Sequence, residues 1–289
     1  MNQAPRAAPP PLDPGVDYAA EYDNRARTPE HPRLFDAWAR HSAAYREERP
    51  PHVLSYGHGE RETIDVFEAG EGSNPGPAVL FIHGGYWQAM DRSSFSVCAR
   101  GLNARGISVG VAGYDLAPSV GIGDIVAQMR RAAVALWRHA GWPVVAAGHS
   151  AGGHLAACLL ATDWEAEHAV KQRVPAAYAI SGLFDLRPLI PTPLNTALRL
   201  DEEEAVRQSP RFWAPPAGLV LDCVVGAAES SEFHRQSRDM ADAWGRAGVQ
   251  TRYESVADAN HFTVLAPLAD ADSRMVARIA ELAERARGG

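Results

Sequence analysis

Residues 144–154 read "VVAAGHSAGGH", a run of small apolar residues followed by a glycine-rich stretch around Ser150. The run 144–147 predicts a buried strand and the residues after Ser150 predict a helix, so the glycines mark a tight strand-to-helix turn. Gly148, Ser150 and Gly152 match G-x-S-x-G, in which glycines permit a strained turn that exposes the serine oxygen. A serine that merely caps a helix is the competing interpretation. Other parts of the chain decide between the two.

From Val53 onward, short β-rich runs alternate with longer amphipathic ones. The expected strands cover residues 52–56, 63–69, 77–84, 108–115, 144–150, 176–182, 221–227 and 251–257, and the expected helices cover residues 93–106, 122–140, 151–163, 232–248 and 272–286. Apolar strands that alternate with helices predict a parallel sheet covered on both faces. Only "GHGERE" separates the first two strands, which is too short for a parallel crossover, so they form a hairpin. The predicted fold class is α/β, with a mostly parallel sheet that begins antiparallel.

The domain organisation follows from length and composition. The chain has 289 residues, of which 46% are hydrophobic and 22% charged, as in a globular protein. We expect a disordered N-terminus over residues 1–16 and a single domain over residues 17–289. Within that domain, residues 17–50 have a helical pattern, and the proline-rich residues 187–216 are expected to form a cap-like insertion near the carboxyl edge of the sheet.

Several partner and cofactor classes are disfavoured. A net charge of −7 argues against nucleic acid and anionic membranes as partners, which leaves a small molecule and leaves a homo-oligomer open. The three cysteines are far apart and form no CxxC pair, and the histidines show no metal-ligand spacing, so neither a metal nor another cofactor is expected. The N-terminus lacks a signal-peptide pattern and no 18-residue apolar run exists, so we expect a cytoplasmic protein.

A catalytic serine needs a base that takes its proton and a carboxylate that orients the base. In α/β-hydrolases these follow in the order Ser, acid, His, each in a loop after a strand. His261 comes after the last expected strand, immediately before the final helix, and Glu229 follows the strand before it. Asp185, after the strand 176–182, is the main alternative acid. Glu232 is less suitable because it begins a helix, where an acidic residue is already favoured by its interaction with the helix dipole. The prediction is therefore Ser150 as nucleophile, His261 as base and Glu229 as acid.

The stretch "FIHGGYW" follows an expected strand where lipases and esterases carry an HGG-type loop. The backbone N–H groups of Gly84, Gly85 and Ala151 are predicted to hold an oxyanion. Tyr86 and Trp87 could flank an aryl ring of the substrate, although core packing explains them about as well.

The other histidines near these motifs are expected to have structural and not catalytic roles. His83 is expected to brace the glycine loop, and His149 and His154 are expected to be packing residues.

Several stretches together resemble the kynurenine formamidases, or arylformamidases, of the α/β-hydrolase fold, which are related to esterases of the hormone-sensitive-lipase type. These stretches are "EYDNRARTPEHP", "FIHGGYWQAMDRSSFS", "GHSAGGHLAA", "SGLFDLRPL", "VVGAAESSEFHRQS" and "ANHF". The resemblance implies a cofactor-free serine hydrolase that removes formate from N-formyl-kynurenine in tryptophan breakdown, with the site residues assigned above. The chain departs from the eukaryotic members, which usually have Asp where it has Glu229.

The favoured function is hydrolysis of an aryl formamide, with N-formyl-L-kynurenine converted to L-kynurenine. A short-chain carboxylesterase, which uses the same residues with an alcohol as leaving group, is the alternative enzyme. A non-catalytic binding protein on a hydrolase scaffold is the alternative from another class. Such a protein would be expected to lack a member of the triad, and none is missing here.

Overall fold

The computed structural model describes residues 9–69, 77–168 and 173–288 and contains an eight-stranded sheet. The strands are β1 (His52–Ser55), β2 (Thr63–Phe67), β3 (Ala78–Ile82), β4 (Ser108–Ala112), β5 (Val144–His149), β6 (Ala176–Ile180), β7 (Val220–Gly226) and β8 (Gln250–Val256). Their order across the sheet is β1-β2-β4-β3-β5-β6-β7-β8. The β1–β2 and β2–β4 pairs are antiparallel, and all pairs from β4 to β8 are parallel. The predicted fold class is therefore confirmed.

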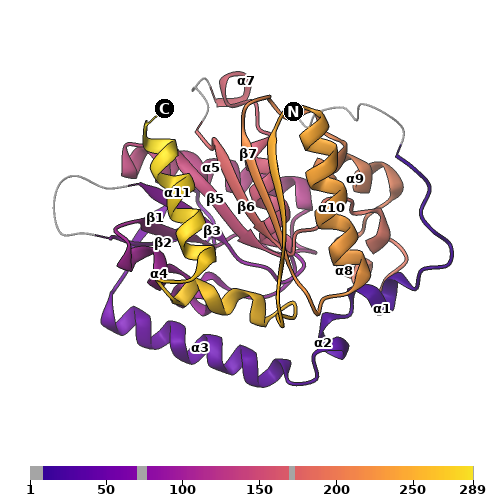
Figure 1. Cartoon of the computed structure of the whole chain (residues 1–289), viewed down its shortest axis with the longest axis horizontal. Coiled ribbons are helices and arrows are strands. Elements are labelled where there is room, and N and C mark those ends of the chain that lie inside the picture. The colour runs from indigo at the N-terminus through magenta and orange to yellow at the C-terminus, as the bar shows by residue number, and fades with distance from the viewer. Residues whose placement is uncertain (1–8, 70–76, 169–172, 289) are drawn as a thin grey trace.

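Helices cover both faces of the sheet because its central strands are apolar on both sides. In β3, Leu80 and Ile82 pack on one face and Val79 and Phe81 on the other. The first face is covered by α5 (Ile122–Ala140), α6 (Ala151–Leu160) and α10 (Ser231–Arg246). The second face is covered by α3 (His31–Glu48), α4 (Arg100–Ala104) and α11 (Arg274–Gly288), with α3 along the lower edge of Figure 1.

Two expected helical regions differ from the prediction. Residues 93–106 form a 3₁₀ helix, η1 (Arg92–Ala99), before the short α4. The Asp91 carboxylate accepts from Ser93 N–H and the Ser96 hydroxyl donates to Ser93 O, so side chains compete with the α-helical hydrogen bonds there. A second 3₁₀ helix, η4 (Thr263–Ala269), separates His261 from α11, so His261 does not directly precede the final helix.

The N-terminal region is helical and lies against the rest of the molecule. Residues 17–50 contain α1 (Tyr18–Tyr22), α2 (Asn24–Arg27) and α3. Of the expected disordered terminus, residues 1–8 lie outside the described residues. The structure differs from this expectation over residues 10–16, because Arg187 Nη1 donates to Pro10 O at 2.6 Å and Leu12 and Val16 pack against the core.

The insertion 187–216 consists of four short helices between β6 and β7. They are η2 (Arg187–Leu189), α8 (Asn195–Leu198), α9 (Glu202–Arg207) and η3 (Pro210–Phe212), and η3 packs against α10, where Trp244 Nε1 donates to Pro210 O. Pro188 and Pro210 lie in the first turn of η2 and η3, where proline is tolerated, and Pro191 and Pro193 separate η2 from α8. A further short helix, α7 (Trp164–His168), follows α6.

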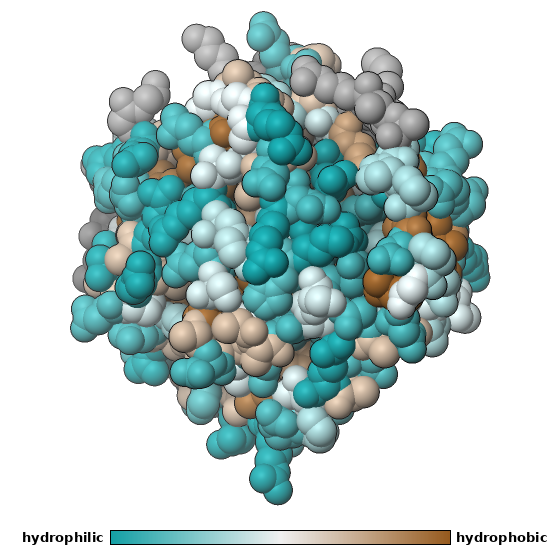
Figure 2. Space-filling view, turned by 45° about the vertical axis from the view of Figure 1, so that its right-hand side comes forward, coloured by the Kyte–Doolittle hydropathy of each residue, from teal (hydrophilic) through white to brown (hydrophobic). Residues whose placement is uncertain are grey.

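Large apolar side chains are almost all internal. The face seen in Figure 2 is mostly hydrophilic, with small and separate hydrophobic areas. Among the described residues, Val53 is the only large hydrophobic residue that is exposed, at 51%. No helix in the described part of the chain is both long and apolar enough to span a bilayer.

Candidate active site

Ser150 occupies a strained turn between β5 and α6. Its φ of 56° and ψ of −117° lie outside the strand and helix regions. The turn packs too closely for side chains at its glycines: a Cβ at Gly148 would overlap with Gly152 O, and one at Gly152 would overlap with Ile82 O. Ser150 is buried, but it lines a cavity of about 460 Å³, and its hydroxyl forms no hydrogen bond to any described residue. The turn thus presents an unpaired hydroxyl to the cavity.

His261 lines the same cavity and is oriented by a buried carboxylate. Its Nδ1 lies 2.7 Å from Glu229 Oε2, and the Glu229 side chain is fully buried. The other carboxylate oxygen, Oε1, accepts hydrogen bonds from the Ser181 hydroxyl at 2.5 Å and from Gly226 N–H at 2.7 Å. These donors compensate for the loss of water around the charge and hold the carboxylate in one orientation. Because Nδ1 is engaged, Nε2 is the nitrogen left for the cavity.

The alternative acids have other partners. Asp185 Oδ2 accepts from Arg187 Nη2 at 2.7 Å in a pair that is almost fully buried. Glu232 accepts from the Tyr22 hydroxyl at 2.8 Å and from Arg235 Nε at 2.6 Å. Neither of these two carboxylates has a hydrogen bond to His261, so Glu229 is the one of the three that contacts it.

The glycine loop lies against the serine. His83 braces it: burial lowers the pKa of His83 to about 4, so the ring is neutral and Nδ1 donates to Gly84 O at 2.7 Å. Gly84 and Gly85 line the cavity, and a Cβ at Gly84 would lie 3.0 Å from Ser150 Cβ. Ala151, in the first turn of α6, is fully buried and is not among the cavity-lining residues. The two glycines are therefore placed where N–H groups could meet an oxyanion on a group attached to Ser150.

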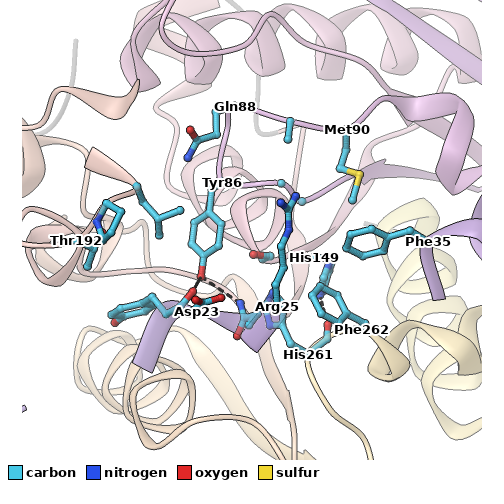
Figure 3. A pocket seen from close by; sticks show the side chains of 18 of the residues that line it. Asp23, Arg25, Phe35, Tyr86, Gln88, Met90, His149, Thr192, His261 and Phe262 are labelled. Carbon is cyan, nitrogen blue, oxygen red and sulfur yellow. Dashed lines mark hydrogen bonds between the residues drawn. The ribbon is translucent and has the colours of Figure 1, made fainter. Parts of the chain in front are cut away.

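The side chains of Tyr86 and Trp87 lie in different environments. Both have positive φ, 49° and 57°. Tyr86 lines the cavity, where its hydroxyl donates to Tyr22 O at 2.7 Å and accepts from Asn24 Nδ2 at 3.1 Å (Figure 3). Trp87 is fully buried and packs edge to face on His154 at 5.0 Å between ring centroids. Trp87 is thus a core residue that does not line the cavity, and its expected contact with substrate does not fit the structure.

Much of the cavity wall comes from the N-terminal helices, which the sequence patterns do not single out. α1, α2 and the residue between them supply Ala19, Tyr22, Asp23, Asn24 and Arg25, and α3 supplies Phe35 and Trp38. The insertion 187–216 supplies only Thr192, Pro193 and Leu194. The sequence feature that could have indicated these residues is "EYDNRA" at 21–26, which mixes an aromatic residue with charged ones. A helix that only packs one apolar face on the core does not need such a mixture. Figure 3 shows Asp23, Arg25 and Phe35 around the cavity with Tyr86, His149 and His261.

Neither a metal site nor a disulfide is found in the described part of the chain. No group of His, Cys, Asp and Glu side chains there has the arrangement needed to hold a metal ion. Cys98, Cys158 and Cys223 are all free and buried.

Comparisons with known proteins place the chain in a family. It is 36% identical to kynurenine formamidase of Salmo salar over 228 residues, which are 76% of this chain and 77% of that protein. It is 34% identical to kynurenine formamidase of Danio rerio over 225 residues (75% and 76%) and 32% identical to that of Drosophila melanogaster over 233 residues (76% and 77%).

Solved structures share the fold of this chain. A candidate thioesterase of Silicibacter sp. TM1040 has a TM-score of 0.82 at 34% identity, covering 92% of this chain and 99% of that one. Esterase 2 of Thermogutta terrifontis has a TM-score of 0.62 at 22% identity, covering 81% and 92%, which supports the fold alone. No family model matches the chain. On the identity and coverage of its relatives, the chain belongs to the kynurenine formamidase family of α/β-hydrolases.

Proposed function

We propose that this protein is a serine hydrolase that converts N-formyl-L-kynurenine to L-kynurenine and formate. The observation that carries the proposal is the 2.7 Å contact between Glu229 Oε2 and His261 Nδ1 at a cavity that Ser150 also lines. This is the arrangement that activates a serine in unrelated hydrolases. The family of the chain supports a hydrolase, and the names of its relatives support the formamide substrate.

In the first half of the reaction, Ser150 Oγ attacks the formyl carbon while His261 Nε2 takes the hydroxyl proton. The Glu229 carboxylate stabilises the imidazolium that forms, and the backbone N–H groups of Gly84, Gly85 and Ala151 hold the oxyanion. The C–N bond then breaks as His261 returns the proton to the departing arylamine nitrogen. The product of this half is the free arylamine and a formyl ester on Ser150.

In the second half, His261 removes a proton from a water molecule that attacks the formyl ester. The same N–H groups hold the second oxyanion, and the C–O bond to Ser150 breaks as His261 returns the proton to Oγ. Formate leaves and the starting enzyme is restored.

The cavity wall contains both the glycine loop and a group of aromatic rings. The Gly84 backbone lies against Ser150, since a Cβ at Gly84 would be 3.0 Å from Ser150 Cβ. The aromatic rings are those of Phe35, Trp38 and Phe262, with ring centroids of Phe35 and Phe262 5.0 Å apart. Aromatic rings at such spacings pack well against a further aryl ring. An aryl leaving group therefore suits this cavity.

A short-chain carboxylesterase is the second candidate. It is favoured by the contact between Glu229 and His261 at the cavity that Ser150 lines, because this arrangement does not depend on the leaving group. The proposed catalytic residues would act in the same way, with an alcohol in place of the arylamine as leaving group.

The test compares kcat/KM for N-formyl-L-kynurenine, its N-acetyl analogue and an aryl butyrate ester. We expect the formamide to be preferred, with formate and arylamine formed in equal amounts, and a graded loss with acyl length because a misfitted methylene is worth about 1–3 kcal/mol. Ser150→Ala should abolish turnover and labelling by a fluorophosphonate without changing the fold. Rapid butyrate hydrolysis with no action on the formamide would favour the esterase, and full turnover by Ser150→Ala would refute a serine mechanism.

We further propose that the enzyme acts in the cytoplasm without metal or other cofactor, on a small-molecule aryl formamide or ester. The three free, buried thiols support a reducing compartment. Chelators should leave turnover unchanged, and restoration of a chelated preparation by zinc would contradict the proposal.

A further inference from the structure

Among the described residues, Arg25 is the only arginine that lines the cavity, and it forms no ion pair with a carboxylate of these residues. Arg27, on the same helix, pairs with Glu21 at 2.7 Å, whereas no ion pair of Arg25 is formed with a described residue. The Arg25 guanidinium carbon lies 6.0 Å from the centroid of the Phe35 ring. Figure 3 shows its side chain running between those of Tyr86 and Phe35. The cavity thus contains an unpaired cation above an aromatic ring.

The segment that carries Arg25 is held in place by buried hydrogen bonds. The Tyr86 hydroxyl binds Tyr22 O and Asn24 Nδ2, which joins the segment to the glycine loop. The Tyr22 side chain is 1% exposed; its hydroxyl donates to Glu232 Oε2 at 2.8 Å and accepts from Gln236 Nε2 at 2.9 Å, both in α10. Such a satisfied buried network fixes one arrangement of the backbone. Arg25 therefore extends from a fixed wall of the cavity.

A continuous aromatic surface leads from His261 to Arg25. The rings of His261 and Phe262 have centroids 5.5 Å apart, and those of Phe262 and Phe35 are 5.0 Å apart. The Arg25 guanidinium in turn lies over the Phe35 ring. A leaving group that has just been protonated by His261 would lie along this surface, with its far end at Arg25.

We propose that Arg25 binds a carboxylate on the leaving-group side of the substrate, so that the enzyme selects aryl formamides with an anionic substituent. This inference rests on the proposed function. A guanidinium binds a carboxylate through two parallel hydrogen bonds, and an unpaired one is free to do so. Asp23 lines the same cavity and is exposed, so a leaving group with an ammonium beside its carboxylate, an α-amino acid, matches both charges.

The test uses two matched substrate pairs: an aryl formamide that carries a carboxylate and its carboxamide, and an aryl acetate ester with the same two substituents. Arg25→Gln should lower kcat/KM for each carboxylate substrate about tenfold, mainly through KM, and leave the carboxamides within about twofold. Because Arg25 is exposed, added salt should reduce the preference of the unmodified enzyme for carboxylates. Arg25→Lys should retain part of the preference.

Arg33→Gln is the matched control, because Arg33 is an exposed arginine of the neighbouring α3 that does not line the cavity. It should leave all four rates unchanged. Equal losses on carboxylate and carboxamide in Arg25→Gln would overturn the proposal, as would a salt-independent preference. If neither formamide is hydrolysed, the proposed function fails while the ester pair still tests Arg25. Calorimetry of the two arylamine products with Ser150→Ala makes the same comparison without turnover.

Discussion

His149 Nε2 lies 2.7 Å from the backbone carbonyl oxygen of His261, 112 residues further along the chain. Burial holds the pKa of His149 well below its ordinary value, so the ring is neutral and Nε2–H donates this hydrogen bond. The bond joins the last residue of β5 to the loop after β8. The residue before the proposed nucleophile thus positions the residue proposed as its base.

Replacing His149 by Phe should separate this positioning role from packing. His149→Phe keeps an aromatic ring but leaves His261 O without its donor, so kcat should fall about tenfold or more while KM changes little. The control is His154→Phe, since His154 donates to Gln208 O and does not line the cavity. Steady-state kinetics that show equal losses in both variants would contradict the positioning role.

Replacing Glu229, the predicted acid, and Asp185, its main alternative, should give opposite phenotypes. Glu229→Gln should keep the fold and lower kcat by about 10⁴-fold, as for neutral replacements of a triad acid. Asp185→Asn should instead break a buried ion pair with Arg187 and cost about 3–5 kcal/mol of unfolding free energy, with near-normal turnover per folded molecule. Urea unfolding and rates normalised to fluorophosphonate-labelled sites measure both effects. A large rate loss confined to Asp185→Asn would show that the acid is misassigned.

Gly152, two residues after Ser150, should tolerate no side chain. In Gly152→Ala the new methyl group would overlap with Ile82 O, so β3 or α6 must move and the protein should lose both thermal stability and activity. Gly141→Ala is the control: no atom lies within 4 Å of the added Cβ, so its cost should be limited to the strain of φ at +76°, about 1–2 kcal/mol. Thermal melts that rank Gly141→Ala as the more damaging change would be inconsistent with the close packing of the turn.

Buried neutral histidines should make the protein sensitive to acid. Burial lowers the pKa of His83 and of His154 to about 4, below the value of about 6.5 in an unfolded chain. The unfolded state therefore binds more protons between these values, so stability is full above pH ~6.5 and falls as the pH drops toward ~4. Each such histidine contributes about 1.4 kcal/mol per pH unit over this range.

Urea unfolding at several pH values checks this expectation. His154→Gln should reduce the slope of unfolding free energy against pH by the contribution of one proton. An unfolding free energy that stays constant or rises from pH 6.5 to 4 in the unmodified protein would contradict the interpretation.

Local sequence was sufficient for the sheet and for the turn at Ser150. Alternating burial and continuous apolar runs are properties of single strands, so all eight strands could be located without knowing their neighbours. Local sequence was a less reliable guide where side chains compete with backbone groups for hydrogen bonds. At Ser93 and Ser96 the structure has a 3₁₀ helix instead of the expected α-helix.

The sequence by itself determined the fold class, the strained serine turn and the order in which Ser150, Glu229 and His261 follow strands. Tertiary structure alone decided that Tyr86 faces the cavity while Trp87 lies in the core, and that Arg25 lines the same cavity as the loops after β3 and β8. The reason is physical: secondary structure depends on contacts within a few residues, whereas a cavity wall depends on contacts such as Asn24 with Tyr86, 62 residues apart. No periodicity in either segment specifies such a contact.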